Sequence, residues 1–338
     1  MLSNATHTTL HNGVAFPLVG FGAAGRLPAS VLEQALDSGF RLIDTAQATE
    51  WYDESAVGIA LKSRALNRSE VWLTSKLHPR DLGEQSTLAA FPTSLRRLHT
   101  HYLDAFLLHY PRCFGELCKD GVPNEDWRGS WRALEELYER KLVRSIGVSN
   151  FRAAELAQLL QFAHVLPHIV QTWMDPLHQE RPLRALCAEH GIAFQAYSTL
   201  GTQHRTRINP VLRHPLLNRL SEQTGRSIAQ VVLRWALQSG AAVIPRAAKR
   251  AHMDANLRLF DFTLNSEQMA AIDALDGTDP NAVVTAALQA LPPKPCDDED
   301  QKCQAWADAG ECENNPGYMH VTCAGSCDTC DERDKHEL

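Results

Sequence analysis

Residues 103–150 contain one complete strand–helix–strand unit, and this unit decides the fold. The stretch LDAFLLH (103–109) is a short apolar run that predicts a buried strand, and SIGVS (145–149) predicts a second one. Between them, GSWRALEELYER (129–140) repeats its apolar side chains at helical spacing. Two apolar runs joined by a helix predict a parallel βαβ unit, because parallel strands need a crossover of this length.

The same alternation runs in both directions, from residue 7 to about residue 290. The expected strands are 18–22, 41–45, 71–76, 103–109, 145–149, 169–173, 192–197 and 242–245. The expected helices are 29–38, 54–66, 86–98, 129–140, 153–162, 182–190, 227–238 and 249–257. Eight consecutive βα units predict an α/β chain with the (β/α)8 architecture of a TIM barrel. Ahead of them, TTLHNGVAF (8–16) predicts a small β-hairpin with Asn-Gly as its turn.

A doubly wound open sheet is the alternative arrangement. It would carry a glycine-rich phosphate-binding turn after its first strand. The stretch GFGAAG (20–25) matches that spacing only weakly. A hairpin before the first strand fits a barrel with a plugged bottom better, so we predict the barrel.

The composition excludes several classes of protein. Of the 338 residues, 44% are hydrophobic and 22% are charged, which is typical of a soluble globular chain and not of a disordered, collagen-like or coiled-coil one. No apolar run approaches the roughly 20 residues that span a bilayer. The net charge of -7 lacks the basic footprint of nucleic-acid binders, so we expect no nucleic-acid partner.

Charge and cysteine content divide the chain into two bodies. Residues 296–338 hold 12 acidic and 3 basic side chains, and six of the nine cysteines lie between Cys296 and Cys330. The stretch LPPKP (291–295) resists helix and favours an extended spacer. We therefore expect a barrel at 7–290, a proline-rich linker at 291–295, a disulfide-rich domain at 296–330 and a tail at 331–338.

Polar side chains recur where the expected strands end. In a barrel the active site lies at the C-terminal ends of the strands. These positions hold Asp44, Lys76, His109, Ser149, Asn150, Gln171, Tyr197 and Arg246. A single buried Asp is more often a structural hydrogen-bond acceptor, but seven strand ends that converge on one mouth predict an active site.

Several of these strand ends lie in blocks that resemble the signature motifs of the aldo-keto reductases. The blocks are RLIDTA (41–46), LTSKL (73–77), YLDAFLLH (102–109), LVRSIGVSNF (142–151), AYSTLG (196–201) and VIPR (243–246). They occur in the family's order, and the resemblance runs from about residue 8 to about residue 276. It implies reduction of aldehydes and ketones to alcohols by hydride transfer from a nicotinamide cofactor.

The resemblance also implies a catalytic set of Asp, Tyr, Lys and His. Asp44, Lys76 and His109 match it without gaps. Family members have Tyr-x-Asn-Glu five residues after the Asp, whereas this chain reads DTAQATEWYDE (44–54), which is two residues longer. Tyr52 is the available tyrosine and is expected to be the proton donor. The alternative is a rebuilt loop in which Tyr52 is a surface aromatic.

The chemistry explains why these residue types are needed. A carbonyl that accepts hydride develops negative charge on its oxygen and needs a proton there. A phenol has an ordinary pKa of about 10, and a nearby ammonium lowers it. We expect Lys76 to be that ammonium, Asp44 to hold Lys76 in place, and His109 to orient the carbonyl.

The cofactor residues follow from the same motifs. Ser149, Asn150 and Gln171 match the positions that hold the nicotinamide carboxamide, and Tyr197 matches the aromatic that stacks on the ring, with Ser198 and Leu200 in its block. At the adenine end, RAAKRAHMDAN (246–256) places Arg246, His252 and Asn256. An arginine can grip a 2′-phosphate in a bidentate way, so we expect NADP(H), with use of NAD(H) also possible. Candidate pocket walls are Trp51, Tyr110, Trp127 and Trp173.

The small body is defined by six cysteines, spaced Cys296-x6-Cys303-x8-Cys312-x10-Cys323-x3-Cys327-x2-Cys330. Zinc sites usually have Cys-x2-4-Cys knuckles at both ends, and only one end has one here, so three disulfides and no metal are expected. Fifteen connectivities are open. The block resembles the ShK-toxin-like (ShKT) domain, which implies the pairs Cys296–Cys330, Cys303–Cys323 and Cys312–Cys327. As an appendage to an enzyme, it is expected to bind a protein partner or to anchor the chain.

The disulfides predict an oxidising compartment. The final KHEL (335–338) resembles the Lys-Asp-Glu-Leu retrieval signal, so we expect the lumen of the endoplasmic reticulum. Residues 1–17 have no apolar signal core, and we expect the leader to be missing from this chain. Cys113 and Cys118 lie in one loop, and the sequence leaves open whether they form a disulfide or stay free thiols.

Two other functions remain open on the sequence. One is a non-catalytic NADP(H)-binding or scaffold protein, which the relocated Tyr52 would support. The other is a secreted binding module in which the ShKT part acts and the barrel is its carrier.

Overall fold

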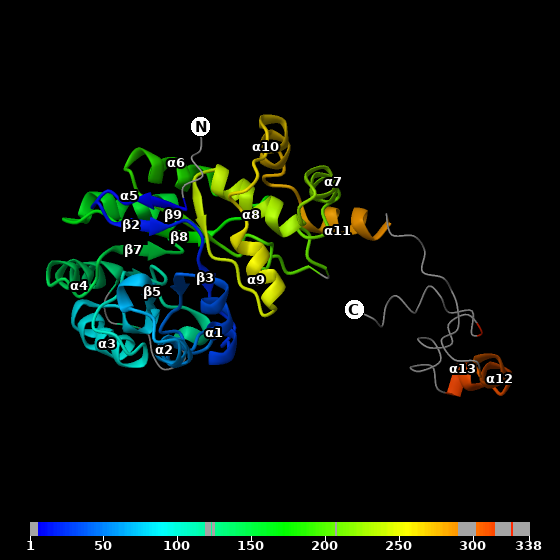
Figure 1. Ribbon diagram of the computed structural model, residues 1–338, viewed down its shortest axis with the longest axis horizontal. Helices are drawn as coiled ribbons and strands as arrows, with labels where there is room; N and C mark the ends of the chain where they lie inside the picture. The colour runs from blue at the N-terminus through cyan, green and yellow to red at the C-terminus, as the bar shows by residue number, and fades with distance from the viewer. Residues whose placement is uncertain are drawn as a thin grey trace.

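The computed structural model describes residues 6–118, 123, 126–206, 208–289, 302–314 and 326. Its main body is a sheet of eight parallel strands in the order β3 to β10, ringed by helices (Figure 1). The strands are β3 (Phe21–Gly22), β4 (Leu42–Asp44), β5 (Trp72–Leu77), β6 (Ala105–Leu108), β7 (Ile146–Ser149), β8 (Ile169–Trp173), β9 (Ala193–Tyr197) and β10 (Ala241–Val243).

The sheet closes into a barrel next to β3. The backbone N–H of Gly20 donates to the carbonyl of Val243 at 2.8 Å, and the N–H of Val243 donates to the carbonyl of Leu18 at 2.8 Å. The first and last strands are thereby joined, and the predicted (β/α)8 barrel is confirmed. A Cβ atom on Gly22 would lie 2.7 Å from the carbonyl oxygen of Ile244. Glycines at this seam therefore allow close strand contact, which explains the weak resemblance to a phosphate-binding turn.

Helices follow the strands as predicted, with boundaries that differ by a few residues. The predicted ones are α1 (Ala29–Ser38), α2 (Glu54–Ser63), α3 (Glu84–Arg97), α4 (Trp127–Glu139), α5 (Ala153–Phe162), α6 (Arg181–Glu189), α8 (Ile228–Gln238) and α9 (Arg250–Leu257). Three further ones were not predicted: α7 (Pro215–Thr224), α10 (Ser266–Asp273) and α11 (Pro280–Gln289). Short 3-10 turns occur at η1 (Arg68–Glu70), η2 (Pro79–Asp81) and η3 (Gly115–Cys118).

The N-terminal hairpin is present, and Asn12 and Gly13 lie in its turn, where Gly13 has a φ of +82° and donates its N–H to the carbonyl of Leu10 at 2.8 Å. Strands β1 (His7–Thr9) and β2 (Ala15–Pro17) pair antiparallel. The loop between them is wider than two residues, because Leu10 still donates its N–H to the carbonyl of Val14 at 2.9 Å. The side chain of Asn12 accepts the N–H of Val14 at 3.2 Å and donates to the carbonyl of Arg144 at 3.0 Å. The asparagine therefore fastens the hairpin to the barrel.

The barrel interior is a packed core that the hairpin closes at its N-terminal end. Phe16 of the hairpin is fully buried and meets Trp72 edge-on, with ring centroids 5.1 Å apart. Leu42, Leu107 and Ile169 belong to the same cluster. A second and larger core fills the space between strands and helices. The N-terminal end of the barrel is thus closed by side chains, as expected for a plugged bottom.

In the C-terminal region the structure describes two short helices, α12 (Cys303–Asp308) and α13 (Glu311–Asn314). Cys303 and Cys312 each take part in a disulfide bond. Trp306 and Ala307 pack against the buried Cys303. The other cysteines of the predicted pairs and the KHEL tail lie outside the described residues. Across the described part of the chain, none of the helices combines the length and apolar character that crossing a membrane requires.

Candidate active site

A buried ion pair lies at the C-terminal ends of two neighbouring strands. Lys76 of β5 is completely buried, and its Nζ lies 2.6 Å from Oδ1 of Asp44 at the end of β4. The same Nζ donates to the carbonyl of Thr45 at 2.9 Å. A charge so deeply buried is tolerated only when it is paired and hydrogen-bonded, and both conditions hold here.

The second oxygen of Asp44 extends this network across the barrel. Nε2 of Gln171 on β8 donates to Oδ2 of Asp44 at 2.7 Å and to Oε1 of Gln195 on β9 at 2.7 Å. Both hydrogens of that amide are therefore engaged. Gln195 was missed by the sequence analysis, although a glutamine inside the apolar run AFQAY (193–197) was the available signal.

Tyr52 lies beside the ion pair, with its ring facing Nζ of Lys76, and is not an isolated surface aromatic. Nζ of Lys76 lies 5.0 Å from the centroid of the Tyr52 ring, and the ring of His109 lies 5.8 Å from it. The N–H groups of Trp51 and Tyr52 both donate to the carbonyl of Ala48, at 3.0 and 2.9 Å. The two extra residues of the loop are therefore taken up in a closed turn, and the structure brings Tyr52, Lys76 and Asp44 together.

His109, which directly follows β6, completes the group. Its side chain is buried, and its Nδ1 has no hydrogen-bond partner among the described residues. Burial, followed by the positive charge of Lys76 and by His78, holds the pKa of His109 well below its usual range. The imidazole is therefore neutral at physiological pH. A buried polar atom without a partner, beside an ion pair, is a position at which a ligand atom would bind.

The pKa of Tyr52 differs from the expectation based on Lys76 alone. Burial raises the pKa of this phenol above its usual value of 10, and the negative charge of Asp44 raises it further. These two effects outweigh the lowering of the pKa that was expected from the ammonium of Lys76. The phenol is consequently protonated throughout the neutral pH range, which is the form that can donate a proton.

The predicted nicotinamide residues lie together at the ends of β7, β8 and β9. The hydroxyl of Tyr197 donates to Oδ1 of Asn150 at 2.6 Å, and Nδ2 of Asn150 donates to the carbonyl of His109 at 2.8 Å. Asn150 has a left-handed backbone with φ of 60°, a conformation that asparagine tolerates better than most residues. Ser149 is buried beside it. These side chains therefore flank His109 and fit an amide-bearing ring.

The predicted adenine-end residues are spread more widely. Arg246 is exposed, and its Nη1 donates to the carbonyl of Ala24 at 3.3 Å. His252 is exposed on α9, whereas Asn256 on the same helix is buried. Ser198 accepts a hydrogen bond from Gln203 through its hydroxyl, at 3.1 Å. The carbonyl of Leu200 accepts from Asn209 at 2.7 Å. Exposed cations after the last strand suit a phosphate group.

Supporting residues behind the Tyr52 loop were also missed by the sequence analysis. Oε1 of Gln47 accepts the N–H of His78 at 3.1 Å, and its Nε2 donates to the hydroxyl of Ser94 at 2.9 Å. Nε2 of His78 lies 3.3 Å from the carboxylate of Glu50. These contacts tie the lengthened loop to β5 and α3. Their sequence separation of about 30 to 50 residues left no local signal.

The four aromatic residues predicted to line the substrate pocket lie in different places relative to His109. Trp51 and Tyr110 lie against His109, with ring centroids 6.0 and 4.9 Å from it. Trp173 stacks on His178 at 4.1 Å, and its indole N–H donates to Asp175 at 2.7 Å. Trp127 is a wrong prediction, because it is the first residue of α4 and is buried against Phe151 and Phe162.

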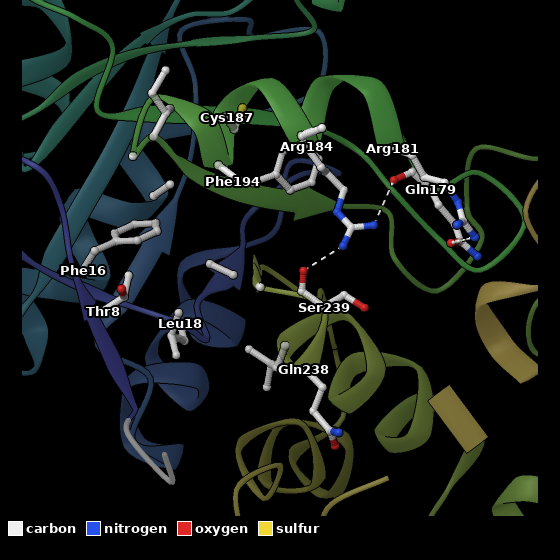
Figure 2. Close-up of a pocket in the computed structure, with 18 of the residues that line it drawn as sticks. Thr8, Phe16, Leu18, Gln179, Arg181, Arg184, Cys187, Phe194, Gln238 and Ser239 are labelled. Carbon is white, nitrogen blue, oxygen red and sulfur yellow. Dashed lines mark hydrogen bonds between the residues drawn. The ribbon is translucent and has the colours of Figure 1, made fainter. Parts of the chain in front are cut away.

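A separate cavity of about 860 Å³ lies beside the N-terminal hairpin (Figure 2). Its walls come from β1, β2, α6 and the starts of β9 and β10. Within it, Arg184 donates to the carbonyls of Gln179 and Ser239, at 3.3 and 2.7 Å. None of Asp44, Tyr52, Lys76 and His109 lines it, so this cavity is distinct from the candidate active site. No group of three or more metal-binding side chains occurs within the described parts of the chain.

A closed βα barrel with an ion pair, a phenol and an imidazole at its C-terminal mouth defines a TIM-barrel protein with a candidate acid–base site. The model of the aldo/keto reductase family matches residues 27–277, and the chain belongs to this family. A model described as ShK domain-like matches residues 295–330.

Similar proteins agree with this assignment. A 9,11-endoperoxide prostaglandin H2 reductase of Trypanosoma cruzi is 35% identical over 280 residues, which cover 82% of this chain and 93% of the relative. A glyoxal reductase of Bacillus subtilis is 36% identical over 271 residues, covering 79% of this chain and 91% of the relative. The crystal structure of an aldo/keto reductase from Brucella melitensis has a TM-score of 0.71 and 36% identity, covering 80% of this chain and 99% of that one.

Proposed function

We propose that the protein reduces aldehydes and ketones to alcohols with NADPH, and that Tyr52 donates the proton to the carbonyl oxygen. Family membership supports carbonyl reduction in general. The observation that carries the finer proposal is the placement of the Tyr52 ring 5.0 Å from Nζ of a fully buried Lys76, which is itself bound to Asp44.

The nicotinamide cofactor would supply a hydride to the carbonyl carbon. The chain supplies the rest of the chemistry. Tyr52 holds its proton until charge develops on the carbonyl oxygen, and Lys76 then stabilises the phenolate that forms. His109 is neutral because its pKa is lowered, so it donates a hydrogen bond without competing as an acid. General acid catalysis of this kind contributes roughly 10²–10⁴-fold to the rate.

Ser149, Asn150, Gln171 and Tyr197 would hold the nicotinamide end of the cofactor. Gln171 spends both amide hydrogens on Asp44 and Gln195, so its Oε1 is left to accept a hydrogen bond from a carboxamide. Arg246, His252 and Asn256 would form the adenine end, with Arg246 on the 2′-phosphate, and this favours NADPH over NADH.

Loss of absorbance at 340 nm tests the proposal, with NADPH and a panel that includes glyoxal, propanal and 4-nitrobenzaldehyde. We expect Tyr52→Phe to lower kcat by about 10²–10⁴-fold. Tyr102→Phe is the matched control, because its hydroxyl contacts only the carbonyl of Arg68, at 3.4 Å, and it should retain wild-type rates. Equal rates for wild type and Tyr52→Phe would remove Tyr52 from the mechanism. Tight NADPH binding without turnover of any carbonyl would favour the non-catalytic cofactor-binding alternative.

We also propose that the protein works in the lumen of the endoplasmic reticulum, where the ShKT-like domain binds a partner. The disulfide at Cys113–Cys118 and the bonded Cys303 and Cys312 support an oxidising compartment. Microscopy of the chain behind a cleavable leader, with and without residues 335–338, tests the location. Secretion of the shortened chain alone is expected, and equal secretion of both would exclude retrieval by this tail.

A further inference from the structure

The segment after β6 carries a disulfide that the sequence left open. Cys113 and Cys118 are bonded and close a ring of six residues. Within this ring, Gly115 has a φ of +52°, a conformation that glycine adopts more readily than residues with a side chain. The buried Leu117 anchors the inner side of the ring, and Arg112, just before it, lies 3.3 Å from Glu155 of α5.

Phe114, inside this ring, is connected to His109 through one intervening aromatic side chain. Tyr110 lies 4.9 Å from His109 on one side and 4.9 Å from Phe114 on the other, between ring centroids. Trp51 stands on a different loop, 6.3 Å from Tyr110 and 6.0 Å from His109. We call Trp51, Tyr110 and Phe114 the aromatic wall.

The aromatic wall is apolar surface that faces solvent beside a buried polar site. Trp51 is 39% exposed and Phe114 is 47% exposed, and both are among the exposed large hydrophobic residues of the described chain. Exposed aromatic surface of this kind marks a place where a ligand or partner binds. Since the wall ends at His109, the ligand that covers it also reaches the carbonyl position.

The disulfide restrains the conformation of the part of the wall that holds Phe114 before a ligand binds. Phe114 is nearly half exposed, and the ring contact that the structure gives it is the one with Tyr110. Without the covalent link, residues 113–118 would sample many conformations, and a ligand would have to order them on binding. Restraining a loop in its binding conformation removes that cost.

We infer that the Cys113–Cys118 disulfide positions Phe114 as the outer part of an apolar wall, and that this wall selects carbonyl compounds carrying an aryl or long alkyl group. The inference rests on the proposed function for the position of the carbonyl. Cys113, Cys118 and Phe114 are specificity residues and touch none of the groups that transfer the proton.

The test compares 4-nitrobenzaldehyde, which can cover the wall, with propanal, which is too short to reach Phe114. The variants are the double Cys113→Ser/Cys118→Ser chain, Phe114→Ala, and Cys187→Ala as a control for the loss of a cysteine outside the disulfides. We expect the double variant and Phe114→Ala each to raise KM for 4-nitrobenzaldehyde by about tenfold, with kcat and the KM for propanal unchanged. A thermal unfolding curve checks that each variant is folded.

A binding measurement keeps this inference separate from the proposed function. Calorimetric titration with 4-nitrobenzyl alcohol, the product, in the presence of NADP+ reports the wall without turnover. If the wild type does not reduce carbonyls but binds this alcohol about tenfold more tightly than both variants, the wall stands and the proposed function fails. If both variants bind the alcohol as the wild type does, or if KM rises equally for both aldehydes, the inference is overturned.

Discussion

The two ends of the barrel differ in the hydrogen-bond partners of their buried charged and imidazole groups. At the C-terminal mouth, Lys76 and Asp44 form a fully buried ion pair, and Nδ1 of His109 has no partner among the described residues. At the N-terminal end, Arg184 and His168 are satisfied largely by backbone groups, with Ile146 donating its N–H to Nδ1 of His168 at 3.1 Å. The hydroxyl of Ser145, just before β7, also has no partner among the described residues, so the contrast between the two ends concerns their charged and imidazole groups.

This difference indicates that the polar groups at the N-terminal end stabilise the fold, whereas those at the mouth are placed to bind a ligand. At the N-terminal end, backbone groups already bind Arg184 and His168, and a cavity of about 860 Å³ is present there. At the mouth, side chains come from the ends of six strands, β4 to β9, and from the Tyr52 loop, and Nδ1 of His109 has no partner among the described residues. The candidate active site is therefore identified by a polar atom without a hydrogen-bond partner beside a buried ion pair, and not by the volume of a cavity.

The largest effect is expected from Lys76→Met at the mouth. It leaves the buried Asp44 without its partner, which should destabilise the fold by about 3–5 kcal/mol. It also removes the charge that stabilises a Tyr52 phenolate, so kcat should fall by about 10²–10⁴-fold. Urea denaturation and the NADPH assay measure the two effects.

The double variant Asp44→Asn/Lys76→Met is the control for this ion pair. It should regain part of the lost stability, because no isolated charge remains, while activity stays low. A double variant that is as unstable as Lys76→Met would show that the ion pair is not the cause.

The next effect is expected at the N-terminal end, from acid. Burial, together with the stacked His11, lowers the pKa of His168 to about 4. Since the unfolded chain binds the proton near pH 6.5, this histidine stabilises the fold fully above pH 6.5 and progressively less as the pH falls to 4. The loss amounts to about 3 kcal/mol.

His168→Asn should remove this part of the pH dependence, because its Oδ1 can still accept the N–H of Ile146 but does not titrate. The free energy of unfolding between pH 4 and 7 measures it, and kcat at pH 7 should not change. An unchanged slope in the variant would assign the acid sensitivity to other groups.

The smallest effect is expected from one arginine at each end. Arg246→Gln at the mouth should raise KM for NADPH by about tenfold and leave KM for NADH unchanged, because a charge-assisted phosphate contact is lost. Arg184→Gln should leave both KM values unchanged and cost about 1 kcal/mol of stability through its two carbonyl contacts. Equal sensitivity of NADPH and NADH to Arg246→Gln would place the 2′-phosphate elsewhere.

The sequence predicted the barrel because its signal is periodic and local. Helices α1 and α5 and strand β8 have the predicted boundaries, since each is an apolar run with clear limits. Helix α7 was missed because His214 provides its N-terminal cap, a residue that is not a usual cap signal. The hairpin turn was predicted at Asn12 and Gly13, but the contact of the Asn12 side chain with Arg144, over 132 positions, had no local signal.

The candidate site was predictable in its members but not in their electrostatics. Asp44, Lys76 and His109 follow from strand ends, and the position of Tyr52 followed only from the lack of another tyrosine nearby. The raised pKa of Tyr52 depends on burial and on the negative charge of Asp44, which are properties of the folded barrel. The supporting pair of Glu50 and His78 is likewise a tertiary contact.

The start of α2 explains how a longer loop keeps its tyrosine in place. The carboxylate of Asp53 accepts the N–H groups of Ser55 and Ala56 at 2.9 and 3.1 Å, and the buried Glu54 accepts the hydroxyl of Ser75 at 2.6 Å. Tyr52 directly precedes Asp53 and Glu54. Its position is therefore fixed by the start of α2 and not by its distance along the chain from Asp44. Residues could therefore be inserted or deleted between Ala48 and Trp51, which changes the rim of the site, while Tyr52, the proposed proton donor, stays in position.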